Sequence, residues 1–309
     1  MSNSFKKNLS VNKGKLELKN PILTASGTFG YGVEFEDFFD VSLLGGITIK
    51  GTTLLPTPGN IPPRIYETKA GILNSIGLAN IGIEETIEKY GEYFKGLRRN
   101  GTKVIINING KQVDDFINII ERCNKVDIFD YYELNVSCPN VKEGGISFSK
   151  TPETVYKLVH EIVPVCKKPL ITKLSPNVSD IKEYVKACEE GGTDIISLIN
   201  TLKGMAIDID KRKPVFKNVF AGFSGPAIKP VALYMTYEAR QATNLPIIAM
   251  GGICDYKDAL EFLIAGADAI ATGSINFVNP KASFEILKDI DNYLSLKNLE
   301  LSDLKNISF

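Results

Sequence analysis

The sequence predicts a (β/α)₈ barrel, the TIM-barrel architecture, from three observations. Short apolar runs that end in small or polar residues recur along the chain, and longer segments with helical spacing of apolar residues follow several of them. Eight such runs occur within 309 residues, a length that suits one barrel domain. Strands that alternate with helices pair in parallel through right-handed crossovers. Eight units most simply close into a barrel, and an open doubly wound sheet is the alternative.

The predicted strands form two groups along the chain. The first group is ILTASGT (22–28), GGITIKG (45–51), KVIINING (103–110) and YYELNVSCP (131–139). The second group is LITKLSP (170–176), IISLINT (195–201), LPIIAMGG (245–252) and AIATGS (269–274). Helix starts are indicated by Thr151-Pro152, a cap before a first-turn proline, and by Ser179-Asp180. Because no linker-like segment divides the chain, residues 1–309 are predicted to form a single domain.

Two segments outside this repeat are predicted to decorate the barrel. Residues 9–20 have the pattern of two short strands about a Lys-Gly turn, a small N-terminal β-hairpin over the bottom of the barrel. The connection between the sixth and seventh strands is unusually long, and a long connection on the catalytic face is more often functional than idle. We therefore expect loop insertions at the C-terminal face.

Composition argues against several classes of protein. Lys plus Arg and Asp plus Glu both number 36, so no net charge attracts nucleic acid or an anionic membrane. Five cysteines, without a CxxC or Cys/His cluster, predict reduced thiols and no metal site in this chain. The amino terminus has no apolar signal core, and no apolar run reaches the roughly 18 residues of a membrane span. These features predict a cytoplasmic protein with neither a nucleic-acid nor a membrane partner.

Polar residues occur at the C-terminal ends of the predicted strands, which surround one mouth in a barrel. Two of them, Lys50 and Lys173, are lysines in otherwise apolar strands, and a buried ammonium group requires an anionic or strongly polar partner. A single such lysine is equally well explained by a structural ion pair, but two lysines with three asparagines favour a ligand site. The polar residues at the strand ends are Ser26, Lys50, Asn107, Asn135, Cys138, Lys173, Asn200, Thr201 and Ser274.

Glycines suggest a phosphate site at the same mouth. Gly251-Gly252 and Gly273 end the seventh and eighth strands, and Gly225 lies in the long connection before them. Glycine lets backbone amides approach phosphate oxygens. Any one of these glycine segments alone is equally typical of an ordinary turn. No GxGxxG follows the first strand, which disfavours a dinucleotide in a Rossmann half. A flavin mononucleotide (FMN) is the preferred ligand, with a sugar phosphate or pyridoxal phosphate as alternatives.

Cys138 is the candidate proton acceptor. The single histidine, His160, falls inside a predicted outer helix and is interpreted as a packing or surface residue. A thiol with an ordinary pKa of about 8.5 can take and return a proton near neutral pH. Cys138 is predicted at the mouth, although an inert buried thiol is the alternative for any lone cysteine. The remaining cysteines fall in or beside predicted helices: Cys123, Cys166, Cys188 and Cys254.

The sequence resembles one enzyme family over nearly its whole length. The motifs are ELNVSCPNVKEGG, NSIGLAN, TKLSPNVSDI, SLINTLKGMAID, FSGPAIKP and MGGICDYKDALEFLIAGADA, and they occur at family-like spacing. They are similar to those of the class 1 dihydroorotate dehydrogenases, specifically class 1B. The resemblance implies an FMN-containing (β/α)₈ barrel that oxidises dihydroorotate to orotate in de novo pyrimidine biosynthesis.

The resemblance also implies roles for individual residues. Cys138 matches the base that removes the proton from C5 while hydride leaves C6 for FMN, and residues 139–145 match a mobile lid. The substrate-binding positions are matched by Lys50, Asn74, Ser75, Ile76, Gly77, Leu78, Asn135, Asn200 and Thr201. The FMN-binding positions are matched by Ser26, Lys50, Gly51, Asn107, Asn135, Lys173, Ile199, Gly225, Gly251, Gly252, Gly273 and Ser274.

The subclass determines the expected partner. The class 2 enzymes use a serine as the base and carry an amino-terminal membrane segment, so the cysteine and the absence of such a segment in this sequence argue against class 2. Class 1A enzymes are homodimers that use fumarate, whereas a class 1B homodimer core pairs in a heterotetramer with subunits that carry FAD and a [2Fe–2S] cluster and reduce NAD⁺. VKEGG, LINTLKGMAID and SGPAIKP favour class 1B. The alternatives are a class 1A enzyme, a flavin barrel that reduces another pyrimidine, and a phosphate-ligand binding protein without catalysis.

Overall fold

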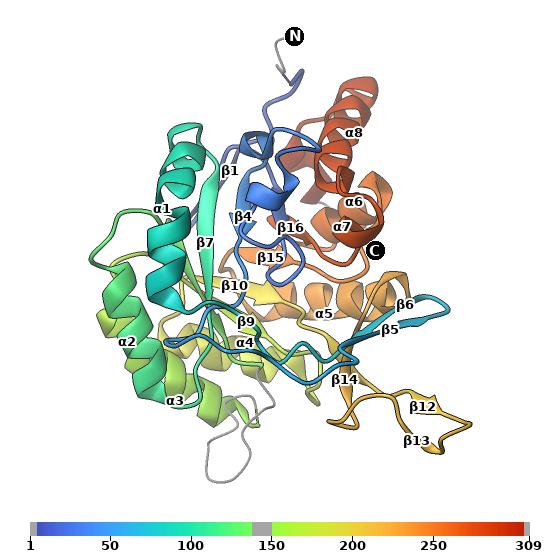
Figure 1. Ribbon diagram of the computed structural model, residues 1–309. Coiled ribbons are helices and arrows are strands. Elements are labelled where there is room, and N and C mark those ends of the chain that lie inside the picture. The colour runs from blue at the N-terminus through green and yellow to red at the C-terminus, as the bar shows by residue number, and fades with distance from the viewer. Residues whose placement is uncertain (1–4, 138–149, 306–309) are drawn as a thin grey trace.

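The computed structural model describes residues 5–137 and 150–305 (Figure 1). Its centre is a closed barrel of parallel strands in the order β10-β15-β16-β3-β4-β7-β8-β9. These strands are β3 (Ile22–Thr24), β4 (Gly46–Thr48), β7 (Lys103–Ile108), β8 (Tyr131–Asn135), β9 (Leu170–Leu174), β10 (Ile195–Leu198), β15 (Ile247–Ala249) and β16 (Ala269–Thr272). Each lies within one of the eight predicted runs. The barrel prediction is therefore confirmed, and the open sheet is excluded.

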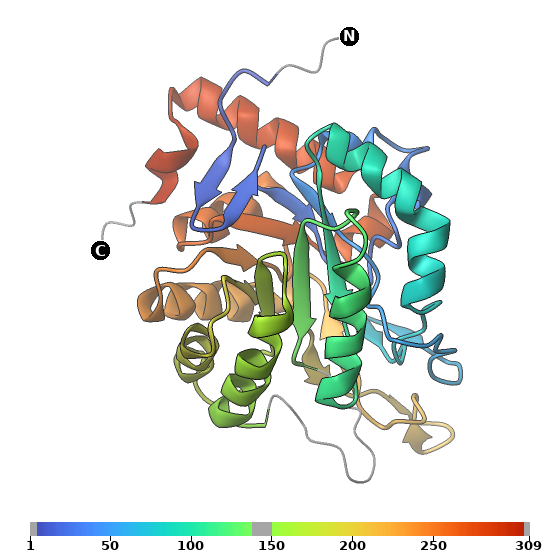
Figure 2. The ribbon, with the colours of Figure 1, turned by 90° about the vertical axis from the view of Figure 1, so that its left-hand side faces the viewer.

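Helices surround the barrel on its outer side (Figures 1 and 2). They are α1 (Ile83–Arg99), α2 (Val113–Cys123), α3 (Pro152–Ile162), α4 (Ile181–Gly191), α5 (Lys229–Ala242), α6 (Tyr256–Ile264), α7 (Ile275–Val278) and α8 (Ala282–Lys297). Short 3-10 helices are η1 (Val33–Phe35), η2 (Val41–Leu43), η3 (Val163–Val165), η4 (Pro226–Ile228) and η5 (Leu301–Lys305). None of the helices in the described ranges is long and apolar enough to cross a membrane.

The helix starts follow the local sequence signals. The side chain of Thr151 accepts a hydrogen bond from the backbone N–H of Thr154, and Pro152 occupies the first turn of α3. The side chain of Asp180 accepts a hydrogen bond from the backbone N–H of Lys182 at the start of α4, and Gly192, with φ +96°, caps the C-terminal end of this helix. Side-chain acceptors satisfy the unpaired N–H groups of a first turn, and glycine adopts the left-handed conformation without a steric cost.

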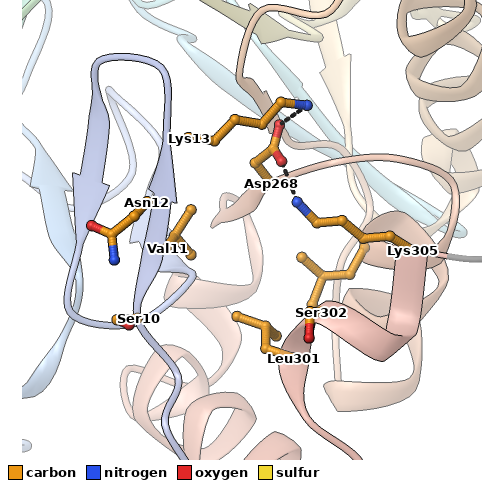
Figure 3. Close-up of a pocket in the computed structure, with 9 residues that line it drawn as sticks. Ser10, Val11, Asn12, Lys13, Asp268, Leu301, Ser302 and Lys305 are labelled. Carbon is orange, nitrogen blue, oxygen red and sulfur yellow. Dashed lines mark hydrogen bonds and ion pairs between the residues drawn. The ribbon is translucent and has the colours of Figure 1, made fainter.

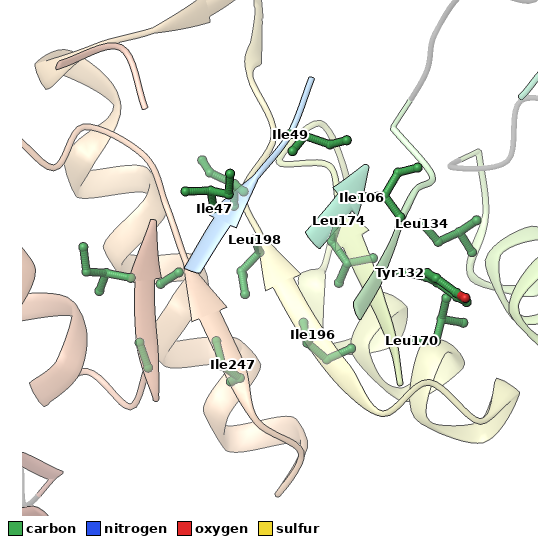
Figure 4. Close-up of a cluster of buried hydrophobic side chains, with 14 of the residues drawn as sticks. Ile47, Ile49, Ile106, Tyr132, Leu134, Leu170, Leu174, Ile196, Leu198 and Ile247 are labelled. Carbon is green, nitrogen blue, oxygen red and sulfur yellow. The ribbon is translucent and has the colours of Figure 1, made fainter. Parts of the chain in front are cut away.

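Strand side chains alternate between two apolar layers. One set points outward and packs against the helices, and Figure 4 labels Ile47, Ile106 and Leu134 among its members. The other set fills the barrel interior, with Ile105, Tyr131 and Ile171 among its members. Successive side chains of a strand point to opposite faces, which explains why nearly continuous apolar runs form these strands.

A hairpin covers the N-terminal end of the barrel, as predicted. Strands β1 (Val11–Lys13) and β2 (Leu16–Leu18) pair in antiparallel fashion, and Gly14 in their turn has φ +53°. Leu16 and Leu18 belong to the interior apolar cluster, so they close the barrel from below. The hydroxyl of Tyr131 accepts a hydrogen bond from the Glu17 N–H at 2.9 Å. In Figure 2 the hairpin lies at the end of the molecule opposite to β12 (Ile207–Asp208) and β13 (Lys213–Pro214).

Insertions at the C-terminal face form a second sheet, in the order β11-β14-β6-β5. It contains β5 (Ile65–Thr68), β6 (Gly71–Asn74), β11 (Leu202–Gly204) and β14 (Ala221–Ser224). The long connection after the sixth barrel strand supplies β11 and β14, which confirms the predicted insertion. The sequence does not predict β5 and β6. Strand β5 is mostly exposed, and β6 pairs with β14 far along the chain, so neither strand has the apolar pattern of a buried one.

Candidate active site

The interior of the barrel changes from apolar to polar towards its C-terminal mouth. Four apolar residues lie on inward-facing positions of adjacent strands: Ile105, Tyr131, Ile171 and Ile195. Two residues further along the same strands are Asn107, Glu133, Lys173 and Ser197. Side chains two positions apart lie on the same face of a strand. A layer of four polar groups therefore lies above the apolar plug of the barrel.

Glu133 is the centre of this polar layer. Its Oε1 accepts a hydrogen bond from Asn107 Nδ2 at 2.6 Å, and its Oε2 accepts from Ser197 Oγ at 3.0 Å. Lys173 Nζ lies 3.7 Å from Oε1, and the side chains of Lys173 and Glu133 are only 5% and 2% exposed. A buried ion pair offsets its desolvation cost only when further hydrogen bonds satisfy its atoms. This requirement is met, because Lys173 also donates to Ser26 Oγ at 3.1 Å.

Glu133 is not among the site residues predicted from the sequence. The available signal was a carboxylate within the apolar strand sequence YYELN, two residues before Asn135. A charge at such a position requires a partner, as do the charges of Lys50 and Lys173. Strand register provides the partners, because Glu133 lies beside Asn107 and Lys173 lies beside Ser197.

Two asparagines meet above the polar layer. Asn135, at the end of β8, accepts a hydrogen bond through Oδ1 from Asn200 Nδ2 at 3.2 Å. The same oxygen accepts from the backbone N–H of Ser137 at 3.1 Å, and Ser137 Oγ donates to the Lys173 carbonyl oxygen at 3.3 Å. Asn200 follows the cis peptide bond between Leu198 and Ile199. These contacts fix the chain immediately before Cys138, which itself lies outside the described residues together with residues 139–145.

A second polar group comes from the insertions. Asn74, the last residue of β6, donates through Nδ2 to the Gly222 carbonyl oxygen at 3.2 Å. A Cβ on Gly222 would lie 2.3 Å from Thr201 Oγ1 and 3.2 Å from Asn74 Nδ2, so these side chains converge at this glycine. Asn177 donates through Nδ2 to the Thr201 carbonyl oxygen at 3.0 Å. Asn177 is not among the predicted site residues, although it lies in the motif TKLSPNVSDI.

The loop after β6 and the residues after β4 complete the predicted set. Ser75 Oγ accepts from Asn60 Nδ2 at 3.0 Å, and the next residues, Ile76 to Leu78, are half-buried. Gly77 and Leu78 have φ of +72° and +57°. A left-handed conformation is uncommon for leucine, and such outliers concentrate at functional positions. Lys50 is half-buried two residues beyond β4, and its backbone N–H donates to the Gly30 carbonyl oxygen at 2.9 Å.

The predicted glycine segments lie together. A Cβ on Gly252 would be 2.9 Å from the Gly225 carbonyl oxygen, and the φ of Gly252 is +74°. Strands β15 and β16 are neighbours, so the loops carrying Gly252 and Gly273 are adjacent. A Cβ on Gly273 would meet no described atom within 4 Å. Open space beside exposed backbone amides is what a phosphate group requires, and Ser274 follows directly at the start of α7.

The asparagines near Gly51 provide a test of whether a ring ligand fits. A Cβ on Gly51 would lie 2.7 Å from Asn109 Nδ2 and 3.1 Å from Asn107 Oδ1, so only glycine allows this close approach. Asn109 is fully buried, and its Oδ1 has no hydrogen-bond partner among the described residues. A buried acceptor without a partner costs about 1 to 3 kcal/mol. The residues at this mouth thus fit a polar-edged ligand with a phosphate group.

The cysteines in or beside helices have raised pKa values. Burial raises the pKa of the Cys166 thiol to about 12, and it raises the pKa values of the Cys123 and Cys188 thiols as well. The pKa of Cys254 is raised first by burial and then by the charges of Asp258 and Asp255. His160 is exposed on α3 and stacks on Tyr156, with ring centroids 5.5 Å apart. None of these side chains belongs to the polar layer.

These pKa shifts predict slow alkylation of the buried thiols. A raised pKa lowers the thiolate fraction at every pH below it, and the thiolate is the reactive form. We therefore expect iodoacetamide to label Cys123, Cys166 and Cys188 at least about tenfold more slowly in the folded protein than in the unfolded chain. Peptide mass spectrometry at neutral and mildly alkaline pH measures the rates, with guanidinium-unfolded protein as the control. Equal labelling of Cys188 in both states would contradict this assignment.

A (β/α)₈ barrel with amide, lysine and glycine groups around its C-terminal mouth has the architecture of a barrel enzyme. In the described part of the chain, no group of three or more His, Cys, Asp or Glu residues could hold a metal ion. The sequence model of the family described as Dihydroorotate dehydrogenase matches residues 8–294. The chain belongs to the dihydroorotate dehydrogenase family, so the resemblance found in its motifs is confirmed.

Three similar proteins from different bacteria have the same name. A protein of Thermoanaerobacter sp. (strain X514), named dihydroorotate dehydrogenase B (NAD(+)), catalytic subunit, is 51% identical over 95% of this chain and 96% of its own length. A protein of the same name from Alkaliphilus metalliredigens is 48% identical over 98% of each chain. Another from Bacteroides thetaiotaomicron is 46% identical over 93% of each chain. The similarity therefore extends over nearly the full length of these relatives.

Proposed function

We propose that this chain is the catalytic subunit of a class 1B dihydroorotate dehydrogenase, a cytoplasmic enzyme that oxidises dihydroorotate to orotate in de novo pyrimidine biosynthesis. We further propose that residues 1–309 form one FMN-binding domain. The observation that carries the proposal is the convergence of Lys173, Asn135 and Asn200 on one barrel mouth in a chain of this family. The name shared by relatives that are about half identical supports the NAD⁺-linked subclass.

FMN would be held by the residues that the resemblance assigns to it. The Gly225, Gly252 and Gly273 segments, which lie together, would receive the phosphate group. Lys173 would offer an ammonium group to the ring, and its contact with Glu133 keeps that group oriented. Asn107 and Gly51 would line the approach to the ring. When bound, FMN supplies the acceptor for the hydride that leaves substrate C6.

Dihydroorotate would be held by the amide side chains at the mouth. Asparagine both donates and accepts hydrogen bonds, which matches the imide edge of the ring and its carboxylate. The hydrogen bond between Asn135 and Asn200 restricts both side chains before substrate arrives, and preorganised donors lose little freedom on binding. Asn74 and Thr201 extend the same surface from the inserted sheet. Lys50 would contribute a positive charge for the substrate carboxylate.

Cys138 would remove the proton from substrate C5. The Ser137 contacts with Asn135 and with the Lys173 carbonyl oxygen support this role, since they hold the preceding residue at the mouth. The sequence predicts no role for Ser137, and with these contacts it would position the neighbouring thiol. Closure of residues 139–145 over the site would exclude water from the reaction.

We also propose that a homodimer of this chain forms the core of a heterotetramer with a subunit that carries FAD and a [2Fe–2S] cluster. The words "catalytic subunit" in the names of the relatives support an assembly with another subunit. Exposed apolar side chains on or directly beside the inserted strands support protein contacts there: Ile65, Tyr66, Met205, Ile207 and Phe220. Large exposed apolar side chains that occur together commonly mark interaction surfaces.

Anaerobic mixing of the purified flavin-loaded protein with dihydroorotate tests the proposal. The flavin absorbance should bleach within the mixing experiment, and orotate should compete with dihydroorotate. Reoxidation by NAD⁺ should require the FAD and [2Fe–2S] subunit. Rapid reoxidation of the isolated chain by fumarate would instead assign it to class 1A. A protein that binds FMN tightly but is not reduced by any dihydropyrimidine would be a binding protein, and the proposed reaction would be wrong.

A further inference from the structure

A cavity lies at the opposite end of the barrel from the candidate active site. It has a volume of about 170 Å³ and is bounded by β1 of the hairpin, the end of α6, the start of β16 and η5. Figure 3 shows Lys13 and Lys305 approaching Asp268 at one end of this cavity, with Val11 and Leu301 beside them. None of these residues has a part in the proposed dehydrogenase reaction. The cavity therefore requires a separate explanation.

Asp268 is surrounded by cations. Its side chain is 1% exposed, and its two oxygens lie 2.5 Å from Lys305 Nζ, 3.0 Å from Arg240 Nη2 and 3.5 Å from Lys13 Nζ. The backbone N–H of Ile247 also donates to it at 2.9 Å. One carboxylate thus faces three positive charges. The local sum is two positive charges in excess, and the carboxylate has little capacity for further donors.

The excess charge is available at the two lysines rather than at Arg240. Arg240 donates to the carbonyl oxygens of Gly266, Thr243 and Leu245, so its guanidinium group is fixed in the protein. Lys13 and Lys305 are 32% and 41% exposed at the rim of the cavity. The pKa of Lys13 is lowered, first by burial and then by the charges of Arg240 and Lys305, although Asp268 opposes this shift. An additional anion here would relieve repulsion between like charges.

We propose that this cavity binds a phosphate dianion, free or as the monoester of a small alcohol. A phosphate monoester carries a charge of about −1.5 to −2 at neutral pH, which balances the local excess. Its oxygens accept from Lys13 and Lys305, and charge-assisted hydrogen bonds of this kind are the stronger ones in proteins. Val11, Leu263 and Leu301 line the cavity as well, so a short organic group on the phosphate finds an apolar wall.

Isothermal titration calorimetry on the flavin-loaded protein tests this site, because bound FMN would already occupy the phosphate position proposed at the mouth. The titrants are inorganic phosphate and glycerol 3-phosphate at constant ionic strength, with chloride as the blank. We expect saturable binding of at least one phosphate titrant. Tighter binding of glycerol 3-phosphate assigns a monoester site, and equal affinities assign a free phosphate site. No heat with either titrant at millimolar concentration overturns the proposal.

Substitutions of the cavity lysines show whether phosphate binds in this cavity or elsewhere on the protein. Lys13→Gln and Lys305→Gln should each weaken phosphate binding by about tenfold, since each removes one charge-assisted contact. Lys15→Gln is the matched control, because Lys15 lies on the same hairpin but pairs with Asp194 at 2.7 Å. It should bind phosphate like the unchanged protein. Thermal unfolding checks that each variant is folded, and Arg240 still neutralises Asp268 in both. Unchanged affinity in the folded Lys13→Gln, Lys305→Gln double variant overturns the proposal.

Discussion

Replacement of Cys138 by alanine is expected to slow the reduction of bound flavin by dihydroorotate by about 10²- to 10⁴-fold, the usual contribution of a positioned general base. This corresponds to an increase of about 3 to 5 kcal/mol in the activation barrier. The reason is that burial raises the pKa values of the four described cysteines, and the only histidine is exposed on the outer helix α3. Anaerobic stopped-flow measurement of the flavin absorbance gives the rate directly.

Two further variants make the Cys138 experiment specific. Cys138→Ser retains a proton acceptor, but the pKa of a hydroxyl is much higher than that of a thiol. Flavin reduction in this variant should therefore be slower, and its rate should increase only at a higher pH than in the unchanged protein. Cys166→Ala is the control, because Cys166 follows η3 on the outer side of the barrel and its Sγ donates to the Ile162 carbonyl oxygen. It should leave flavin reduction unchanged. An unchanged rate in Cys138→Ala would remove the thiol from the mechanism.

Replacement of Glu133 by glutamine is expected to lower the free energy of unfolding by about 3 to 5 kcal/mol, the usual cost of removing one partner of a buried ion pair. The charge of Lys173 would remain at a site that is 5% exposed, without its carboxylate. Lys173→Met should cost a similar amount, because Glu133 would then be the unpaired buried charge. Urea unfolding of the purified protein, followed by circular dichroism, measures both effects.

A double-mutant cycle distinguishes the ion pair from simple loss of packing. In the Glu133→Gln, Lys173→Met double variant both charges are gone, so much of the lost stability should return. FMN affinity should nevertheless stay weak, because the ammonium group proposed to face the ring is absent. Glu92→Gln is the control, since Glu92 is 85% exposed and pairs with Lys95 on the surface. Additive losses in the double variant would show that Glu133 and Lys173 stabilise the barrel independently.

Much of the fold could be predicted because its signals are local. A buried strand needs a short apolar run, and a helix start needs a side-chain acceptor at its cap, so β8 and the caps Thr151 and Asp180 follow from neighbouring residues. The parallel strand-helix repeat then implies the barrel, and the barrel implies one common mouth. Asn135 and Lys173 could therefore be assigned to one place before their distance was known.

Only the tertiary structure determined the partners of buried charged residues, because those partners come from distant parts of the chain. In the sequence Glu133 is a carboxylate without an evident partner. The register of the barrel strands places Asn107, Lys173 and Ser197 beside it. Likewise, Asp268 acquires its three cations from the hairpin, α5 and η5. Sequence patterns report propensity and periodicity, which act over a few residues, whereas the pairing of buried charges depends on packing between elements. The sequence by itself thus determined the barrel and the polar residues that end its strands at one mouth, and packing determined which charges meet inside the barrel and below it.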